Sequence, residues 1–279
     1  MMIGSEEGLF GWITGNYLNK ILFENEKEGK LKNIPYGSID LGGYSLEITF
    51  TTNETLKEHN INLNLSEINY NLYSYSFQDY GQTRFATILL ESIIRNISKP
   101  ESSNIISNPC YLEGYTETYE FENINYKNDI KLCQEYVRSA MNISEENEKS
   151  MNNVYQPKIP ENMNFYGISG LYWIANFFKN ADDKFHSASD FLNPIEEFCK
   201  KKWENAIKEY GEDIYYLKNY CAIGYYVYYF LVDGFKIDKD KKILAFPEKI
   251  NGIEPGWTLG AMSYEIDLLP LQGSKYLNY

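Results

Sequence analysis

The chain has 279 residues, of which 43% are hydrophobic, so it can bury a sizeable core in one large domain or two small ones. Its formal net charge of −13 argues against nucleic acid or an acidic membrane surface as the partner, because both require a basic protein surface. No apolar run approaches the ~20 residues that cross a bilayer, so we expect no membrane segment within the chain.

The first predicted element is an amphipathic helix over residues 8–23. Apolar residues such as Leu9 and Ile13 recur there at helical spacing. Glu6 and Glu7 stand at the amino end of this helix, where the helix dipole favours a carboxylate. Helix capping accounts for only one of the two acids.

A strand, a tight reversal and a second strand are predicted from the sequence GSIDLGGYSLEITF, residues 37–50. The second strand alternates apolar and polar residues. Since strand side chains alternate between two faces, Ser45 and Glu47 share one face at the mouth of the turn.

The turn itself has features of an anion site. Gly42 and Gly43 lack a Cβ, so the backbone can adopt positive φ and its amides can approach a bound anion. Asp40, just before the turn, is placed to hold a metal ion or its waters over that anion. In an acidic chain, backbone amides, helix N-termini and a divalent cation are the available sources of positive charge for a phosphate. The alternative is a plain Gly-Gly hairpin with a polar outer face.

The middle of the chain continues with a polar, irregular segment over residues 53–73. A helix follows, with Phe85, Leu89 and Ile93 on one face. Residues 165–178 then predict a strand end that turns through glycines into a buried helix.

Three more helices complete the predicted elements. Residues 194–210 predict the first, and residues 220–232 a buried second that ends at Asp233-Gly234. Pro255-Gly256 is a turn, and Trp257, which we expect to pack in the core, begins the last helix.

Cysteines and sequons suggest a secretory history. The cysteines fall in two local groups, Cys110 with Cys133 and Cys199 with Cys221, without a CxxC metal pair, so they form disulfides or remain free and buried. The start, MMIGSEEG, lacks the basic and apolar regions of a signal peptide. Asn-x-Ser/Thr sequons occur at Asn53, Asn64, Asn96 and Asn142.

Several motifs together resemble, in order, conserved regions of the apyrase, or nucleoside triphosphate diphosphohydrolase, family of nucleoside phosphatases. They are GSEEGLFGWITGNYL, GSIDLGGYSLEITF, YSFQDYGQTRFA, NPCYLEGY, FYGISGLYW, NYCAIGYYVYYFLVDGF and GWTLGAM. The resemblance implies an α/β fold, a ribonuclease-H-like lobe of the actin and hexokinase type with a mixed central sheet flanked by helices. It also implies hydrolysis of the terminal phosphate of a nucleoside di- or triphosphate with Ca²⁺ or Mg²⁺, and it implies that both cysteine pairs are disulfides.

Carried onto the matching positions, the resemblance assigns roles to five residues. Glu7 would be the general base that takes a proton from the attacking water, although spacing alone leaves Glu6 as the alternative. Asp40 would hold the metal through its water shell, Gly42 and Gly43 would cradle a phosphate, and Ser45 would orient the water.

Two further positions are less regular matches. Glu47 stands where the family usually has Gln, which adds a negative charge beside the phosphate, although a protonated Glu could still donate a hydrogen bond. Tyr172 would stack on the base, with a core role as the alternative. The arginine that the family places opposite has no counterpart, and Tyr215, Tyr216 and Lys218 occupy its neighbourhood.

The family's first two conserved regions, including a DxGSSG-type phosphate loop, have no counterpart. Residues 1–257 would then form the second, C-terminal lobe, and residues 258–279 the segment that returns to a missing first lobe. The expected partners are a nucleoside di- or triphosphate and an N-terminal lobe in cis or in trans. We expect the complete protein in the lumen of the secretory pathway or outside the cell, anchored to a membrane.

Two other functions remain open. The chain could be a half-protein that binds nucleotide without catalysis. It could also serve another phosphate chemistry, such as that of a sugar kinase of the same superfamily, although the Glu-Glu-Gly and Gly-Trp-x-Leu-Gly motifs argue against this.

Overall fold

The computed structural model describes residues 4–22, 34–65, 68–96, 105–119, 122–126, 129–141, 150–178, 184–211 and 216–268. The strands are β1 (Gly37–Leu41), β2 (Ser45–Thr51), β3 (Asn60–Leu65), β4 (Ile68–Gln78), β5 (Ile105–Asn108), β6 (Thr116–Tyr119), β7 (Glu122–Tyr126), β8 (Phe165–Ser169) and β9 (Leu244–Ala245). The α-helices are α1 (Gly4–Leu18), α2 (Gln82–Asn96), α3 (Ile130–Ala140), α4 (Gly170–Phe177), α5 (Leu192–Cys199), α6 (Trp203–Tyr210), α7 (Tyr220–Tyr229) and α8 (Trp257–Leu268).

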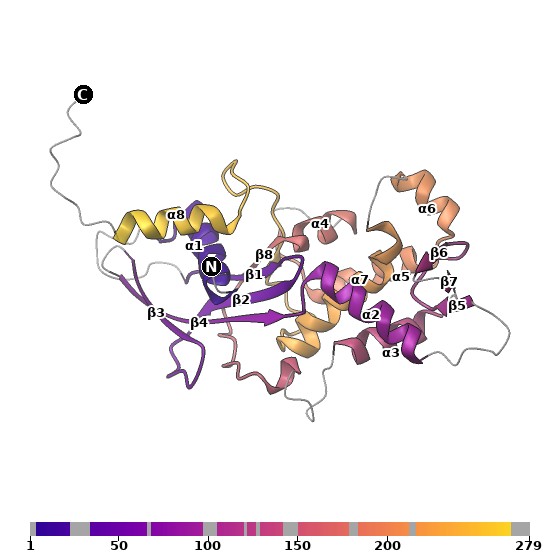
Figure 1. The fold of residues 1–279 in the computed structure, drawn as a ribbon. Helices are drawn as coiled ribbons and strands as arrows, with labels where there is room; N and C mark the ends of the chain where they lie inside the picture. The colour runs from indigo at the N-terminus through magenta and orange to yellow at the C-terminus, as the bar shows by residue number, and fades with distance from the viewer. Residues whose placement is uncertain are drawn as a thin grey trace.

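Six strands form one mixed sheet in the order β3-β4-β2-β1-β8-β9 (Figure 1). β1 and β2 are the predicted antiparallel hairpin, whereas β8 runs parallel to β1 and β9 runs parallel to β8. A small second sheet, β5-β7-β6, lies at the opposite end of the molecule from β3. The α/β fold with a mixed central sheet and flanking helices is confirmed.

Side chains of the central strands point alternately to the two faces of the sheet, and the two faces differ. Ile39 and Leu41 of β1, like Leu46 and Ile48 of β2, point into the larger core, which α2 and α7 also line. The other face of the hairpin carries polar side chains that are nevertheless buried, because α1 covers them: Ser38, Asp40, Glu47 and Thr49. A buried polar layer between a helix and a sheet is unusual, and it marks where a site can form.

Helix α1 differs from the predicted amphipathic helix. It begins at Gly4 and ends at Leu18, and its residues are buried nearly all round, since the sheet lies on one side and α8 on the other. A Cβ on Gly260 of α8 would lie 1.9 Å from the carbonyl oxygen of Phe10, so the backbones of the two helices approach each other closely at this glycine. Thr14 Oγ1 also donates to the carbonyl of Gly256 at 2.8 Å.

The close approach of α8 and α1 leads to a stability prediction. We expect Gly260→Ala to lower the free energy of unfolding, because the added Cβ meets a backbone atom and such overpacking costs about 3 kcal/mol at the upper end of its usual range. The gain of about 1 kcal/mol in helix propensity from Gly to Ala leaves a net loss of about 2 kcal/mol. Urea unfolding measures it, and Gly256→Ala is the matched control, since a Cβ there would have no atom within 4 Å. Equal stabilities of the two variants would contradict the packing of α8 on α1.

Residues 258–268 of the segment expected to return to another lobe therefore pack on α1, and residues 269–279 lie outside the described residues. The domain division at residue 257 stays a prediction.

The predictions for two segments were wrong. Residues 53–73 are not irregular throughout, because β3 and β4 pair there as antiparallel strands. In β3, the asparagines at the alternate positions 60, 62 and 64 lie on the outer face of an edge strand, which made the segment look irregular. Residues 194–210 form two helices instead of one, because Trp203 N donates to the carbonyl of Glu113 from a distant loop and the chain bends there.

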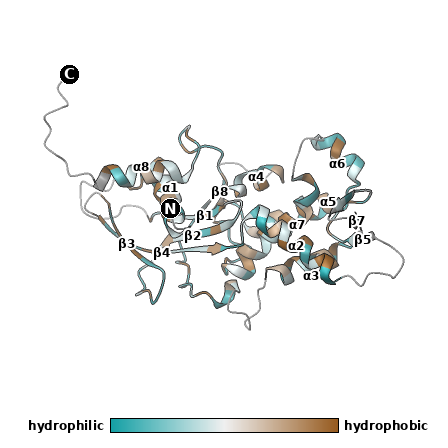
Figure 2. Ribbon diagram, in the orientation of Figure 1, coloured by the Kyte–Doolittle hydropathy of each residue, from teal (hydrophilic) through white to brown (hydrophobic). Residues whose placement is uncertain are grey.

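The remaining helices agree with the predictions. Phe85, Leu89 and Ile93 of α2 are buried, and hydrophobic and hydrophilic residues alternate along this helix in Figure 2. β8 and α4 form the predicted strand-to-helix turn over residues 165–178, and α7 is buried. Among the residues the structure describes, we find no helix long and apolar enough to cross a membrane.

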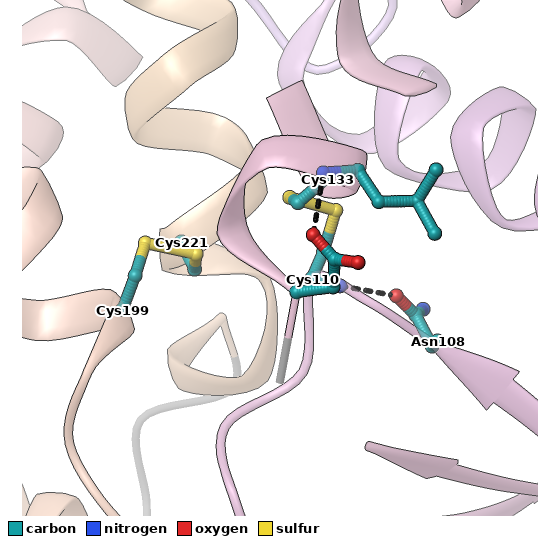
Figure 3. Close-up of a disulfide and its surroundings, with 7 residues drawn as sticks. Asn108, Cys110, Cys133, Cys199 and Cys221 are labelled. Carbon is teal, nitrogen blue, oxygen red and sulfur yellow. Dashed lines mark hydrogen bonds between the residues drawn. A yellow bond between two sulfur atoms is a disulfide. The ribbon is translucent and has the colours of Figure 1, made fainter. Parts of the chain in front are cut away.

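Both expected disulfides are present, Cys110–Cys133 and Cys199–Cys221 (Figure 3). The first joins the segment after β5 to α3, and the second joins the end of α5 to α7. They span sequence separations of 23 and 22 residues. In the chain-entropy account each lowers the entropy of the unfolded chain and so raises the free energy of unfolding by about 3 kcal/mol.

Candidate active site

Glycines along one side of α1 let this helix lie directly on the polar face of the sheet. A Cβ on Gly8 would lie 2.9 Å from Thr49 Oγ1 and 3.1 Å from Glu47 Cβ, and one on Gly11 would lie 3.7 Å from Asp40 Oδ2. A side chain at Gly8 would push the helix away from the strands. The glycines therefore bring the first turn of α1 close to the strand carboxylates.

Two of those carboxylates are cross-strand neighbours. Asp40 of β1 and Glu47 of β2 are paired directly opposite each other in the hairpin, so their side chains share a face. Asp40 is 2% exposed and Glu47 is 1% exposed. Buried like charges at this spacing repel each other, which favours protonation or a bound cation.

Glu47 is held at one oxygen only. Ser76 Oγ of β4 donates to Glu47 Oε1 at 2.7 Å, whereas Oε2 is buried without a hydrogen-bond partner. Burial raises the pKa of Glu47 to about 8, although the nearby Ser45 and Ser76 hydroxyls lower it. The negative charges of Asp40 and Glu7 add to the rise.

Asp40 has a similar environment. Burial raises its pKa to about 6, a hydrogen bond from the Ser169 side chain opposes the rise, and the charge of Glu7 adds to it. Asp40 Oδ2 is buried without a hydrogen-bond partner.

Glu7 and Glu6 differ in where they lie, which spacing alone could not resolve. Glu7 is half-buried and close enough for its charge to raise the pKa of both Asp40 and Glu47. Partial burial also raises the pKa of Glu7 itself. Glu6, in the same turn, is exposed. The structure thus brings Glu7, Asp40, Glu47 and Ser45 to one place.

The Gly-Gly turn follows the predicted position but not the predicted backbone conformation. Of the described glycines, those with positive φ are Gly114, Gly211 and Gly252, so Gly42 and Gly43 do not use the left-handed region. Instead, their carbonyls cap α2, which starts beside the turn.

Three backbone bonds make this cap. Gly42 O accepts from Gln82 N at 2.9 Å, and Gly43 O accepts from Thr83 N and Arg84 N at 3.0 Å each. The turn is therefore fixed against the amino end of a helix. The role of the two glycines as a phosphate cradle stays a prediction.

Two carboxylate oxygens are the groups of this site that could face a hydrated divalent cation. Among the described residues, no group of three or more His, Cys, Asp and Glu side chains is arranged to bind a metal directly. The two unpartnered oxygens, Asp40 Oδ2 and Glu47 Oε2, are the hard carboxylate donors that Ca²⁺, Mg²⁺ and their bound waters prefer.

Tyr172 lies beside the site, on α4. Its ring meets that of Trp173 edge-on at 5.0 Å, and the two rings line a pocket of about 210 Å³ together with Ser169 and Trp257. Burial and then the nearby Glu248 carboxylate raise the pKa of the Tyr172 hydroxyl. Trp257 is half-buried and packs against the core of α1, as expected.

The residues near the expected arginine position are otherwise engaged. Lys218 forms an ion pair with Glu117, and the Tyr216 hydroxyl lies 3.5 Å from Thr83 Oγ1. Tyr215 lies outside the described residues. Among the described residues near the expected arginine position, none therefore offers a free cation that could face Tyr172.

Sequence reasoning missed two serines at the site. Ser76 pairs directly opposite Glu47 on β4, and the alternation of serine and aromatic residues in YSYSF could have placed it on the polar face. Ser169, at the end of β8, is near enough to lower the pKa of Asp40, and no local pattern predicts the pairing of β8 with β1.

Comparisons with known proteins show what the chain as a whole is similar to. Ectonucleoside triphosphate diphosphohydrolase 8 of Gallus gallus is 27% identical over 306 residues, which cover 99% of this chain and 61% of that protein. Ectonucleoside triphosphate diphosphohydrolase 1 of Bos taurus is 29% identical over 305 residues, which cover 96% of this chain and 58% of that protein. The chain thus spans about three-fifths of the length of these relatives.

Among solved structures, a nucleoside triphosphate hydrolase from Neospora caninum matches with a TM-score of 0.71 and 13% identity, over 95% of this chain and 64% of that one. This likeness confirms the actin-type fold. Residues 1–275 match the sequence pattern of the GDA1/CD39 (nucleoside phosphatase) family, nearly the whole chain. The chain therefore belongs to the GDA1/CD39 family of nucleoside phosphatases.

Proposed function

We propose that the chain takes part in hydrolysis of the terminal phosphate of nucleoside di- and triphosphates by metal-assisted, in-line attack of water. The observation that carries the proposal is the meeting of Glu7, Asp40 and Glu47 on one buried polar face, in a member of a nucleoside phosphatase family. In-line phosphoryl transfer needs positioning and charge neutralisation more than covalent chemistry.

Glu7 takes a proton from the attacking water. A general base works best when its pKa lies near the working pH, and partial burial raises the pKa of Glu7 in that direction. Ser45 and Glu47 orient the same water from the facing strand. Glu47 suits this role because Ser76 fixes one of its oxygens and leaves the other unpartnered.

Asp40 holds Ca²⁺ or Mg²⁺ through its water shell, and a bound cation supplies neutralisation of the charge on the phosphate. Gly42 and Gly43 cradle that phosphate with their backbone. Tyr172 stacks on the base at the mouth of the pocket that it shares with Trp173 and Ser169.

The complete site needs an N-terminal lobe, in cis or in trans. Residues 1–257 supply the second lobe and residues 258–279 return toward the first. The match to about three-fifths of the curated relatives' length supports this proposal, as do the family motifs of the second lobe.

The protein works in the lumen of the secretory pathway or outside the cell, anchored to a membrane in its complete form. Two disulfides support this location, because disulfides persist in oxidising compartments. The sequon residues Asn53, Asn64 and Asn96 are exposed, as glycosylation requires, and Asn142 lies outside the described residues.

Phosphate release from ATP, UDP and GDP tests the proposed function. We expect release by the oxidised chain, joined to a first lobe where needed, in Ca²⁺ or Mg²⁺, and its loss in excess EDTA because the phosphate charge is then not neutralised. Nucleotide binding without release, with both lobes present, would favour a non-catalytic binding protein. Transfer of phosphate to a sugar in place of water would favour a kinase.

A further inference from the structure

The pocket beside Tyr172 lies at the edge of the central sheet where three parallel strands end. β8 runs parallel to β1 and β9 runs parallel to β8, so their carboxyl ends meet at this edge. The Gly-Gly turn follows β1, Ser169 ends β8, and Pro247 and Glu248 come soon after β9. Ser169, Pro247 and Glu248 all line the pocket, which has a volume of about 210 Å³. Open α/β sheets commonly bind ligands outside the carboxyl ends of their strands, so this pocket is suitably placed for one.

Aromatic rings form much of the pocket wall. Tyr172, Trp173 and Trp257 line it, and Trp173 is 59% exposed, although proteins usually bury most of a tryptophan. Rings of this kind stack on nucleobases, and every base is accepted because every base has a π-face. The rings can therefore hold a base, but a choice between bases has to come from the polar groups of the pocket.

The charged residues that line this pocket are both acidic, Glu248 and Glu254. A tight turn between them fixes their backbone, because Ile250 N donates to Ile253 O at 2.8 Å and Ile253 N donates to Ile250 O at 3.1 Å. The two acids therefore flank one turn and line the same pocket. Both carboxylates are near enough to Tyr172 to raise the pKa of its hydroxyl, after the larger effect of burial, and Glu248 contributes more than Glu254.

The polar character of the pocket matches one kind of base edge. An ionised carboxylate only accepts hydrogen bonds, and its two oxygens can take a pair of parallel donors. Guanine presents such a pair on its Watson–Crick edge, the ring N1–H beside the 2-amino group. Uracil has one N–H between two carbonyls that a carboxylate repels, and adenine and cytosine place an acceptor nitrogen beside the amino group. Guanine is therefore the base that a carboxylate in this pocket recognises best.

We propose that Glu248 is a specificity-determining residue, whose carboxylate accepts from the guanine base of a nucleotide held against Tyr172. The inference rests on the proposed function, in which Tyr172 stacks on the base. Glu248 is favoured over Glu254 because it follows β9 at the edge where the parallel strands end and acts more strongly on Tyr172. Glu254 makes the pocket more acidic, which adds to the rejection of bases that present carbonyls.

Equilibrium binding of GDP, inosine diphosphate, ADP and UDP in EDTA tests the inference without an enzymatic readout. Two of the four tryptophans, Trp173 and Trp257, line the pocket, so tryptophan fluorescence follows binding. The four nucleotides carry the same diphosphate, and inosine diphosphate differs from GDP only in lacking the 2-amino group. The oxidised chain is compared with Glu248→Gln and Glu254→Gln. Glu265→Gln, a change at an exposed acid of α8 outside the pocket, is the matched control.

We expect the wild type to bind GDP about fivefold or more tightly than inosine diphosphate and UDP, the low end of the discrimination that a bidentate contact to a base supplies. Glu248→Gln should bring the affinities for GDP and inosine diphosphate to within about twofold of each other. Glutamine places a donor beside its acceptor, the pair that adenine matches, so this variant should also gain affinity for ADP. A merely structural role of Glu248 would weaken the binding of all four nucleotides together. Glu254→Gln and Glu265→Gln should keep the preference for GDP over inosine diphosphate.

Equal affinities of the wild type for GDP and inosine diphosphate, or a GDP preference that survives Glu248→Gln, would overturn the inference. Tyr172→Ala then separates the base pocket from its specificity, because weaker binding of all four nucleotides by that variant would leave the proposed stacking on Tyr172 standing. A wild type that binds none of the four would overturn both. GDP-selective binding without phosphate release in Ca²⁺ or Mg²⁺ would leave the inference standing and refute the proposed hydrolysis.

Discussion

Glu7→Gln is expected to lower metal-dependent phosphate release by about 10²- to 10⁴-fold, the usual effect of losing a general base. Glutamine has nearly the shape of glutamate, so the first turn of α1 keeps its packing on the strands, but it cannot accept the proton of the attacking water. Because the base acts in the chemical step, we expect the loss in kcat, with little change in KM. The measurement is steady-state phosphate release from the most active nucleotide.

Glu6→Gln is the matched control. It removes the same charge from the same helical turn, but Glu6 is exposed whereas Glu7 lies near Asp40 and Glu47. We expect its activity to stay within about twofold of the wild type, since surface changes away from a site have small effects. A large loss in Glu6→Gln with little loss in Glu7→Gln would reverse the assignment of the base.

The sequence predicted the parts of the site that depend on local order. The hairpin of β1 and β2 follows from alternation around a Gly-Gly turn, and it places Asp40 and Glu47 on one face by register alone. The acids at the start of α1 follow from helix periodicity. These features need only the period of a strand or a helix, so they can be read from the chain.

Features that depend on contacts between distant segments could not be read. Burial of α1 on both sides requires α8, which lies more than 200 residues away in the chain and meets it through Gly260. Ser76 and Ser169 come from β4 and β8, strands whose places in the sheet are set by tertiary pairing. For the same reason the capping of α2 by the Gly42 and Gly43 carbonyls was missed, and positive φ was expected in its place.

The choice between Glu6 and Glu7 shows the limit most directly. Both acids are in the first turn of α1, and either satisfies the helix dipole. Only the direction in which the helix presents each side chain to the sheet separates them, and the glycines at 8 and 11 set that direction. The spacing of glycines along α1 is the feature of the sequence that indicates this direction.

Glu47 should make the folded chain less stable as the pH rises. Burial raises its pKa to about 8 in the native state, above its ordinary value of 4.5. Between these two values the native state keeps a proton that the unfolded chain loses, so the free energy of unfolding falls by up to about 1.4 kcal/mol per pH unit. The stabilising effect of protonation is full below pH 4.5 and is lost by the time the pH has passed 8.

Glu47→Gln removes this dependence while keeping an oxygen that can accept from Ser76. We expect the free energy of unfolding of the variant to rise relative to that of the wild type from pH 5 to pH 8, by several kcal/mol at most. Above pH 8.5 the two free energies should change with pH in parallel. A slope below pH 6 should remain in both, because burial also raises the pKa of Asp40, to about 6. Urea unfolding in EDTA measures the difference, and Glu54→Gln, a change at an exposed acid, should follow the wild type.

Parallel profiles for Glu47→Gln and wild type from pH 5 to 8 would mean that Glu47 ionises as freely in the fold as in the unfolded chain. A carboxylate in that state could not donate a hydrogen bond to the water at neutral pH, and it would take part in the site only as an acceptor or beside a bound cation.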